Sequence, residues 1–132
     1  MTGTPQPAVV LFVVDLPRMT RFYRDVAGCT VRSSSATHRV LDASGLELVL
    51  HEIRAGLKNP PQAGAPRVAE EAALKLCLPV PDLARTRTLA AELGGGLHAP
   101  STEWDGDGYR ACDGWDAEGN VVQFREPREP SV

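Results

Sequence analysis

Hydrophobic positions in this chain fall into short runs that polar residues, prolines and glycines separate. Residues 8–14 (AVVLFVV) form an apolar, β-branched run with the length of a buried strand. Asp15 follows this run and can cap a helix, and Pro17 suits the first helical turn. The pattern predicts a helix over residues 16–26 that ends near Gly28. Three strand-like segments follow at 30–35, 37–42 and 46–53.

The second half of the chain shows the same order of elements. It comes after residues 54–69, whose three prolines and two glycines predict a linker. Residues 73–80 predict a strand, and Asp82 opens a predicted helix over 83–93. Three further strand-like segments lie at 97–102, 108–113 and 120–126.

The two halves are related as an internal repeat. A shift of 67 positions superimposes them without a gap from residue 8 to residue 28. The matched pairs include Leu11 and Leu78, Asp15 and Asp82, Arg18 and Arg85, and Gly28 and Gly95. We therefore predict an α+β fold in which residues 1–132 form a single domain of two units, each a strand, a helix and three strands. The first unit spans 8–53 and the second 70–127.

Side chains of a strand alternate between two faces, and the predicted strands have faces of different character. One face is aliphatic, as Val9 and Val13 illustrate, and we expect it to pack under the helices. The opposite face mixes polar and apolar residues, such as Glu47, Val49 and His51. A mixed face either meets solvent or, if the two sheets curve together, lines a pocket for a small ligand.

The composition excludes several classes of function. The chain is 42% hydrophobic and 23% charged, as globular proteins are, and its net charge of -3 offers no basic face for nucleic acid. No apolar run approaches the roughly 20 residues of a membrane-spanning helix, and the N-terminus lacks the features of a signal peptide. Cys29, Cys77 and Cys112 have no metal-binding spacing, so we expect buried, reduced thiols in a cytoplasmic protein.

Several short motifs occur in order along the chain. They are Val13-x-Asp15, the segment Phe22-Tyr23-Arg24-Asp25 with Gly28, Gly108-Tyr109-Arg110, and the turn Asp116-Ala117-Glu118-Gly119-Asn120. Together they resemble the vicinal oxygen chelate superfamily, which includes glyoxalase I, extradiol dioxygenases, fosfomycin-resistance enzymes and bleomycin-resistance binding proteins; Ala117 departs from that family's usual proline. The resemblance covers residues 8–127 and implies two βαβββ modules whose curved mixed sheets surround a cleft, with helices on the outside. It also implies a homodimer.

The resemblance also implies where a metal would bind. Metal-dependent members place ligands, usually histidine and glutamate, at positions that correspond here to Ala8, Glu47, Lys75 and Gln123. Alanine and protonated lysine cannot bind a metal, and glutamine is a weak ligand for transition metals. We therefore expect no metal and no other cofactor. In place of a metal, we hypothesise a salt bridge between Glu47 and Lys75.

Other residues are candidate contacts for a ligand. His51 shares a strand face with Glu47, so a Glu–His general base stays open beside the alternative of a solvated histidine at the rim. We expect His38 and His98 at the surface. Phe12 lies on the mixed face of the first strand.

Two aromatic residues of the second half lie in glycine-rich surroundings. Trp104 precedes a DGDG stretch and is expected to cover the cleft as a lid, whereas Trp115 is expected to pack. Tyr109 and Arg110 are neighbours on one strand, so only one of them faces the cleft. The predicted ligand-binding residues are Phe12, Glu47, His51, Lys75, Trp104, Tyr109, Arg110 and Gln123, and no catalytic residue is predicted.

Three functions remain open at this point. The first, which we favour, is a metal-independent binding protein that sequesters a small aromatic or partly anionic molecule in a cleft. The second is a lyase, isomerase or dioxygenase of the same superfamily, with a non-standard or metal-free site. The third is a protein-interaction role in which another subunit covers the mixed face. For the partners, we expect a small molecule and a second copy of the chain, and neither nucleic acid nor a membrane.

Overall fold

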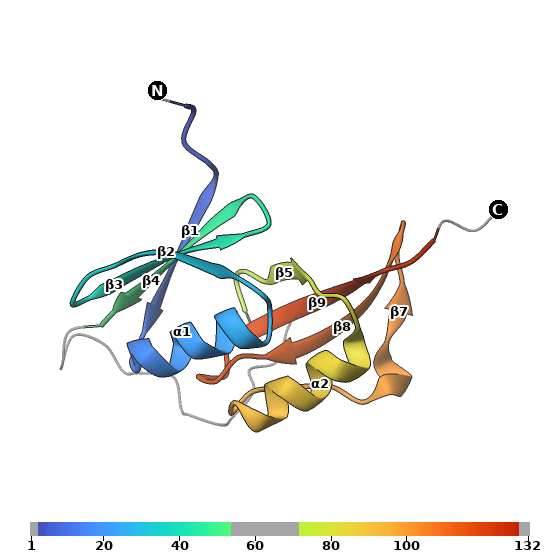
Figure 1. Cartoon of the computed structure of the whole chain (residues 1–132). Coiled ribbons are helices and arrows are strands. Elements are labelled where there is room, and N and C mark those ends of the chain that lie inside the picture. Colours follow the sequence, from blue (N-terminus) through green and yellow to red (C-terminus); the bar gives the residue numbers. More distant parts are fainter. Residues whose placement is uncertain (1–2, 54–71, 130–132) are drawn as a thin grey trace.

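The computed structural model describes residues 3–53 and 72–129, and the chain folds into two sheets with two helices in these ranges (Figure 1). The predicted linker over 54–69 lies outside the described residues. The elements of the first half are β1 (Ala8–Val13), α1 (Leu16–Asp25), β2 (Thr30–Ser34), β3 (His38–Ala43) and β4 (Leu46–Glu52).

The second half repeats this order with one addition. Its elements are β5 (Leu76–Pro79), α2 (Leu83–Glu92), β6 (Gly96–Leu97), the 3-10 turn η2 (Pro100–Thr102), β7 (Trp104–Asp105), β8 (Tyr109–Trp115) and β9 (Val121–Pro127). The strand predicted over 97–102 is therefore wrong beyond Leu97. Pro100 has no N–H for a sheet, and the Thr102 hydroxyl donates to the carbonyl oxygen of Ala99 at 2.6 Å, which closes a turn instead.

The two sheets have equivalent strand orders. The first sheet runs β1-β4-β3-β2, and the second runs β5-β9-β8-β6, with β7 on the outer edge of β8. In both sheets the first strand pairs in parallel with the last, and the remaining pairs are antiparallel. The α+β fold with tandem βαβββ modules is thus confirmed, and the two sheets remain separate rather than closing into a barrel.

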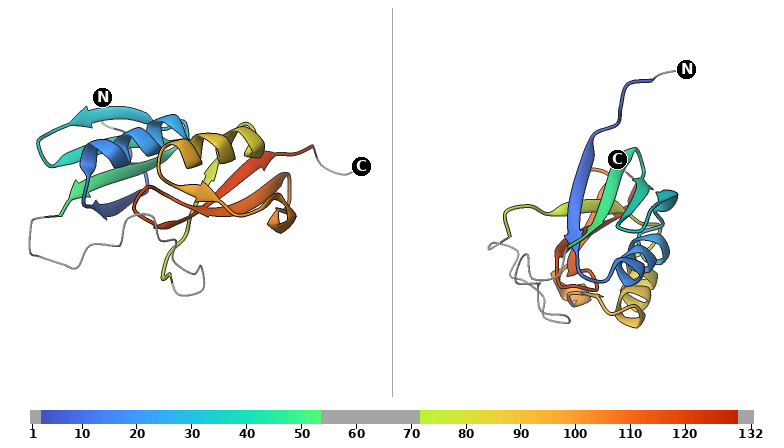
Figure 2. Two further views of the ribbon diagram at one scale, coloured as in Figure 1. Left: turned by 90° about the horizontal axis from the view of Figure 1, so that it is seen from below. Right: turned by 90° about the vertical axis from the view of Figure 1, so that its left-hand side faces the viewer.

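Both helices lie on the same side of the sheets and begin at matching residues (Figures 1 and 2). The Asp15 side chain accepts a hydrogen bond from the Arg18 amide at 3.1 Å, and Asp82 accepts one from the Arg85 amide at 3.0 Å. These N-caps satisfy amides that a helix leaves free at its first turn. The helix starts predicted from the repeat are therefore confirmed. None of the helices in the described ranges is long and apolar enough to span a membrane.

The aliphatic faces of the strands form the core beneath the helices. Leu48, Leu50, Val122 and Phe124 are fully buried, as the alternation of β4 and β9 predicts. From α1, Phe22 packs into the same core. Neither α1 nor α2 lies on the opposite faces of the sheets (Figure 2). Any site built on the mixed strand faces is therefore on the side away from the helices.

The turn between β8 and β9 joins the two halves through buried polar groups. The Glu118 carboxylate accepts hydrogen bonds from the amides of Val14 and Asp15 at 2.8 to 3.0 Å. The Tyr23 hydroxyl donates to Asp116 Oδ2 at 2.7 Å. Burial raises the pKa of both Tyr23 and Asp116, although the hydrogen bonds to Asp116 oppose part of its shift. This turn fixes the first half against the second, and with it the relative position of the two open faces.

Candidate functional site

A chain of hydrogen bonds crosses the open face of the second sheet. Lys75 Nζ lies 3.1 Å from Asp113 Oδ2, and Gln123 Nε2 donates to Asp113 Oδ1 at 3.1 Å. Arg125 Nε donates to Gln123 Oε1 at 2.8 Å. Gln123 is only 4% exposed, and both ends of its amide have a partner. The four side chains, from β8, β9 and the segment before β5, are therefore held in one arrangement.

Aromatic side chains extend this face toward the edge of the sheet. The Arg125 guanidinium lies over the ring of Tyr109, 4.3 Å from its centroid. Tyr109 meets Trp104 edge to face, with ring centroids 5.8 Å apart. Trp104 is 44% exposed, on the short strand β7 that pairs with β8. Its backbone is thus paired in a sheet, directly before the DGDG stretch beside which a lid was predicted.

The open face of the first sheet carries a row of rings. Phe12 of β1, His51 of β4 and His38 of β3 lie opposite one another in the strand register. The ring centroids are 5.4 Å apart for Phe12 and His51, and 4.1 Å apart for the two histidines. Phe12 is 50% exposed, as is Val10 on the same face of β1. This face therefore presents an apolar and aromatic surface.

Glu47 and Lys75 do not form the hypothesised salt bridge. Glu47 sits half-buried in the first sheet, opposite Ala8. Lys75 pairs with Asp113 instead, and no ion pair joins it to Glu47 among the described residues. The reason is topological, because Asp113 comes from β8 of the same sheet and lies next to Gln123 in the strand register.

The register also gives a different equivalence between the last strands of the two units. Leu50 lies opposite Leu11 of β1, and Phe124 lies opposite Leu78 of β5. The repeat matches Leu11 with Leu78, so Leu50 and Phe124 occupy corresponding positions. One residue earlier, Gln123 corresponds to Val49. Glu47 lies two residues before Val49, so the two halves do not present Glu47 and Gln123 in the same way. The expected quartet is therefore not a symmetric set.

A cavity of about 400 Å³ lies between the two halves, next to this network. Its walls come from β1, from the segment that leads into β5, and from the start of β9. They are Val9, Val10, Leu11, Tyr23, Ala72, Ala73, Leu74, Lys75, Leu76, Asn120 and Val121. Most of these are apolar, and Lys75 contributes the single charged side chain of this lining. An apolar cavity with a few polar groups is the usual design of a small-molecule site.

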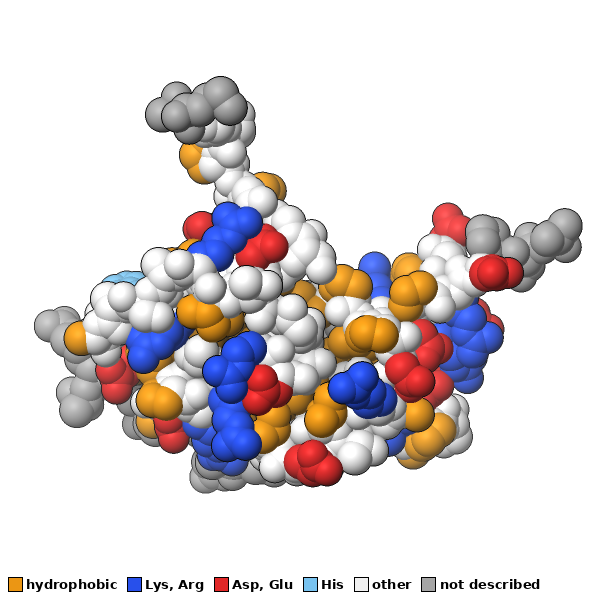
Figure 3. Space-filling model, in the orientation of Figure 1, with side chains coloured by type: hydrophobic (Ala, Val, Ile, Leu, Met, Phe, Trp, Pro, Cys, Tyr) orange, Lys and Arg blue, Asp and Glu red, His pale blue; other side chains and the backbone are white. Residues whose placement is uncertain are grey.

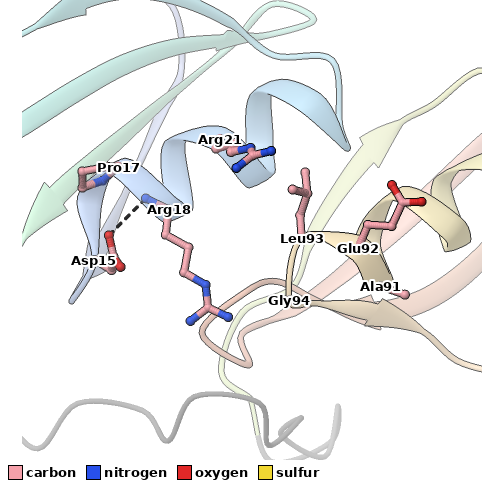
Figure 4. Close-up of a pocket in the computed structure, with 8 residues that line it drawn as sticks. All are labelled: Asp15, Pro17, Arg18, Arg21, Ala91, Glu92, Leu93 and Gly94. Atoms are coloured by element: carbon pink, nitrogen blue, oxygen red, sulfur yellow. Dashed lines mark hydrogen bonds between the residues drawn. The ribbon is translucent and has the colours of Figure 1, made fainter.

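A second cavity of about 550 Å³ opens on the opposite side, between α1 and the end of α2 (Figure 4). Arg18, Arg21 and Glu92 border it, and all three are exposed. The helix-bearing face that surrounds it carries basic and acidic side chains side by side (Figure 3). Mixed, solvated charges of this kind are ordinary for a protein surface, so we place the candidate site on the open faces instead.

The donor set at the positions of a metal site does not suit a metal ion. Lys75 supplies an ammonium group without a lone pair, and it is paired with Asp113. Gln123 directs its amide nitrogen at Asp113 and its oxygen at Arg125, so neither end is available. Within the described ranges, no three His, Cys, Asp or Glu side chains are grouped as metal ligands. The residues therefore do not fit the metal that this superfamily commonly holds.

The predicted ligand-binding residues divide among three places. Phe12, Glu47 and His51 lie on the first sheet, whereas Gln123 and Tyr109 lie on the second, with Trp104 on β7 and Lys75 directly before β5. Arg110 points to the helix-bearing side instead, where it pairs with Glu103 at 2.9 Å and Asp105 at 3.0 Å. As predicted, only one of Tyr109 and Arg110 faces the open side. Of the set, only Lys75 lines the cavity between the halves.

Trp115, His98 and the cysteines complete the comparison. Trp115 packs over Gly96, where a Cβ atom would overlap its indole, and it contacts His98 at 5.1 Å between ring centroids. Cys29 and Cys112 are buried, and burial raises the pKa of the Cys29 thiol to about 11. Cys77 is exposed, which contradicts the expectation of three buried thiols. It belongs to the open face of β5, which no helix covers.

Asp113 is the functional residue that sequence reasoning missed. A signal for it exists, because the tight turn at 116–120 sets the register of β8 and β9 and puts Asp113 directly opposite Gln123. Arg125 is not among the ligand-binding residues predicted from the sequence. Its guanidinium lies over the ring of Tyr109 because β9 pairs with β8, and no sequence pattern predicts this contact.

The paired sheets, the two capped helices and the β8–β9 turn are those of the vicinal oxygen chelate superfamily. Residues 8–124 match the family of Glyoxalase-like domains, and the chain belongs to this family. A comparison with the sequences of curated proteins found no match.

Solved structures share the fold over nearly the whole chain. The fosfomycin resistance protein FosX from Mesorhizobium loti is 14% identical, with 97% of this chain and 95% of that chain covered and a TM-score of 0.62. FosX from Listeria monocytogenes, solved with Mn(II) and sulfate, is 15% identical over 97% and 93%, with a TM-score of 0.65. An integron cassette protein from the mobile metagenome of V. cholerae is 22% identical over 96% and 97%, with a TM-score of 0.61. At these identities the likeness establishes the fold alone.

Proposed function

We propose that this chain is a metal-independent small-molecule-binding protein of the glyoxalase and bleomycin-resistance type. It sequesters a small aromatic or partly anionic ligand in the cleft between its two halves. The observation that carries the proposal is the hydrogen bonding of Lys75 and Gln123. At positions where metal-dependent relatives hold an ion, these side chains are tied to Asp113 and Arg125 beside a largely apolar cavity.

The cavity supports the kind of ligand proposed. Its apolar walls favour a hydrophobic body, and its volume of about 400 Å³ is within the usual range for small-molecule sites. An ammonium group has three N–H donors, and Asp113 accepts one of those of Lys75, so further donors remain for an anionic group. Two of the structural relatives are named as fosfomycin resistance proteins, which supports a small-molecule ligand without identifying it.

The exposed apolar row on the first sheet supports a homodimer as part of the same proposal. Val10 and Phe12 on β1, and Val14 directly after it, are 45% to 50% exposed and together form a contiguous apolar row. A second copy of the chain that covers this row would also enclose the cavity more completely, because Val10 belongs to both. A cytoplasmic location remains the expectation from the sequence.

Elemental analysis of the purified, chelator-treated protein is the first test. After soaking with zinc, nickel, iron and manganese, we expect less than stoichiometric metal. Ligand-observed NMR on the same sample should then detect binding of small aromatic compounds such as 1-naphthoate and 1-naphthalenemethanol. A stoichiometric metal that withstands dialysis would refute the proposal and favour a metalloenzyme of the superfamily.

A pair of variants locates the binding. Val10→Gln places a polar side chain in the cavity wall and should weaken both naphthyl compounds severalfold. Val14→Gln is the matched control, because Val14 belongs to the same exposed row but does not line the cavity, so it reports any effect that comes through the proposed dimer contact alone. Equal effects of the two substitutions would show that the ligands bind elsewhere.

A further inference from the structure

Arg125 differs from an ordinary surface arginine because two contacts fix its guanidinium. The ring of Tyr109 lies 4.3 Å from Cζ, and Gln123 Oε1 accepts a hydrogen bond from Nε at 2.8 Å. A free arginine side chain loses rotamer entropy when it is immobilised on a ligand. Much of that ordering is already present here, before any ligand binds.

The two contacts leave the terminal nitrogens of Arg125 for another partner. A guanidinium has five N–H donors, and the hydrogen bond to Gln123 uses the one on Nε. Within the described part of the chain, Arg125 has no carboxylate in an ion pair. The remaining edge, formed by Nη1 and Nη2, has the spacing that matches two oxygens of a carboxylate or phosphonate.

The rest of the network keeps the charge of Arg125 from being neutralised. Asp113 is the carboxylate of the group, and its two oxygens are occupied by Lys75 and Gln123. The network therefore carries two cations and one anion. A neutral amide stands between Asp113 and Arg125, so no carboxylate of the network or of the other described residues forms an ion pair with Arg125.

We infer that Arg125 binds the oxyanion of the ligand, a carboxylate or a phosphonate, through Nη1 and Nη2, with Gln123 and Tyr109 as positioning residues. Arg125 lies outside the lining of the cavity, so this contact is on the open face of β9, which Gln123, Asp113 and Lys75 connect to the cavity. The inference rests on the proposed function and specifies its ligand as an oxyanion with an apolar body. It also gives a reason for glutamine at position 123. A glutamate there would pair with Arg125, cancel its charge and repel Asp113, whereas the amide can donate to Asp113 and accept from Arg125 at once.

The test measures small oxyanions and a matched pair of aromatic ligands on metal-free protein. Acetate and methylphosphonate, which have no aromatic body, are titrated while the ¹⁵N–¹H signals of the arginine side chains are followed. Isothermal calorimetry then compares 1-naphthoate with neutral 1-naphthalenemethanol. We expect the Arg125 signal to shift with both small anions, and 1-naphthoate to bind at least about tenfold more tightly than the alcohol.

Three variants assign the effect to a fixed guanidinium. Arg125→Met should remove about tenfold or more of the affinity for 1-naphthoate and leave the alcohol unchanged, and Arg125→Lys should restore little because it lacks the planar edge. Gln123→Glu should weaken 1-naphthoate as well, although it keeps Arg125. Arg128→Met is the control, since it removes an equal charge directly after β9. Arg128 is exposed, and its Nε lies 3.9 Å from Glu126 Oε2.

Each other outcome overturns the inference in a distinguishable way. If 1-naphthoate and the alcohol bind equally and Arg125→Met changes neither, Arg125 does not recognise the anion, while the proposed function stands. If Arg128→Met acts as strongly as Arg125→Met, the effect is general electrostatics and the inference fails. If neither naphthyl compound binds, the proposed function fails. If, in addition, the Arg125 signal does not shift with acetate or methylphosphonate, the inference about Arg125 fails independently.

Discussion

Replacing Tyr23 by phenylalanine tests the contact that holds the two halves together. Tyr23 comes from α1, is fully buried, and donates its hydroxyl proton to Asp116 Oδ2 at 2.7 Å. Asp116 belongs to the β8–β9 turn and is also fully buried. The substitution deletes one oxygen and keeps the ring, so it removes the hydrogen bond without opening a large cavity.

The expected loss of stability follows from what remains around Asp116. Oδ2 keeps a hydrogen bond from Asn120 Nδ2 at 3.0 Å, so the buried carboxyl oxygen still has a hydrogen-bond donor. A hydrogen bond of this kind contributes about 1 to 3 kcal/mol to the free energy of unfolding, with the upper part of the range for an ionised acceptor. Because the bond from Tyr23 favours the charged form, the pKa of Asp116 should rise further in the variant. The loss should therefore be larger at pH 7 than near pH 4.

Urea unfolding at these two pH values measures both effects. Tyr109→Phe is the matched control, because Tyr109 lies half-buried on the open face and its replacement should change the free energy of unfolding by less than about 0.5 kcal/mol. A Tyr23→Phe variant as stable as the control, or one whose loss is the same at both pH values, would refute this account of the turn.

Three further predictions concern the same turn and the network. Glu118→Ala should lower the free energy of unfolding by about 2 kcal/mol in urea titrations, because the amides of Val14 and Asp15 lose the buried carboxylate that accepts their hydrogen bonds. Burial raises the pKa of Asp116, so the native state keeps this proton to a higher pH than the unfolded chain does; stability should fall as pH rises from about 4 through the native pKa, and Asp116→Asn should flatten that part of the stability profile. Lys75→Ala should weaken anionic ligands selectively in calorimetry, and an equal loss for neutral ligands would contradict a role in charge recognition.

Local signals predicted the parts of the fold that depend on neighbouring residues. Asp15 and Asp82 cap their helices as expected because a cap needs only the next three residues. The alternation of β4 and β9 identified the core face for the same reason. The strand after α2 was mispredicted because Pro100 and a threonine hydroxyl outweigh its apolar start.

The candidate site depends on pairings that the sequence leaves open. The alternation of side chains along the chain assigns Lys75 to the open face. Its partner, however, depends on which residues of the sheet lie beside it. That partner is Asp113 on β8, not Glu47 in the other sheet. Arg110 was included in the site although parity allowed either it or Tyr109, and the structure directs it to Glu103 on the helix side. The alternation of side chains predicts which face of the sheet a residue lies on, whereas the pairing register of neighbouring strands determines which residues it contacts.

The network on the second sheet also explains why a metal site could not be recovered by exchanging the ligand residues alone. Histidine at position 75 and glutamate at 123 would restore two usual ligand types, but Arg125 would still lie within hydrogen-bond reach of residue 123. A glutamate there would pair with this guanidinium rather than wait for a metal ion, and the fixed positive charge would oppose a divalent cation nearby. Position 8 would remain alanine. The surroundings of Lys75 and Gln123 thus favour an organic anion over a metal ion as strongly as those two residues do.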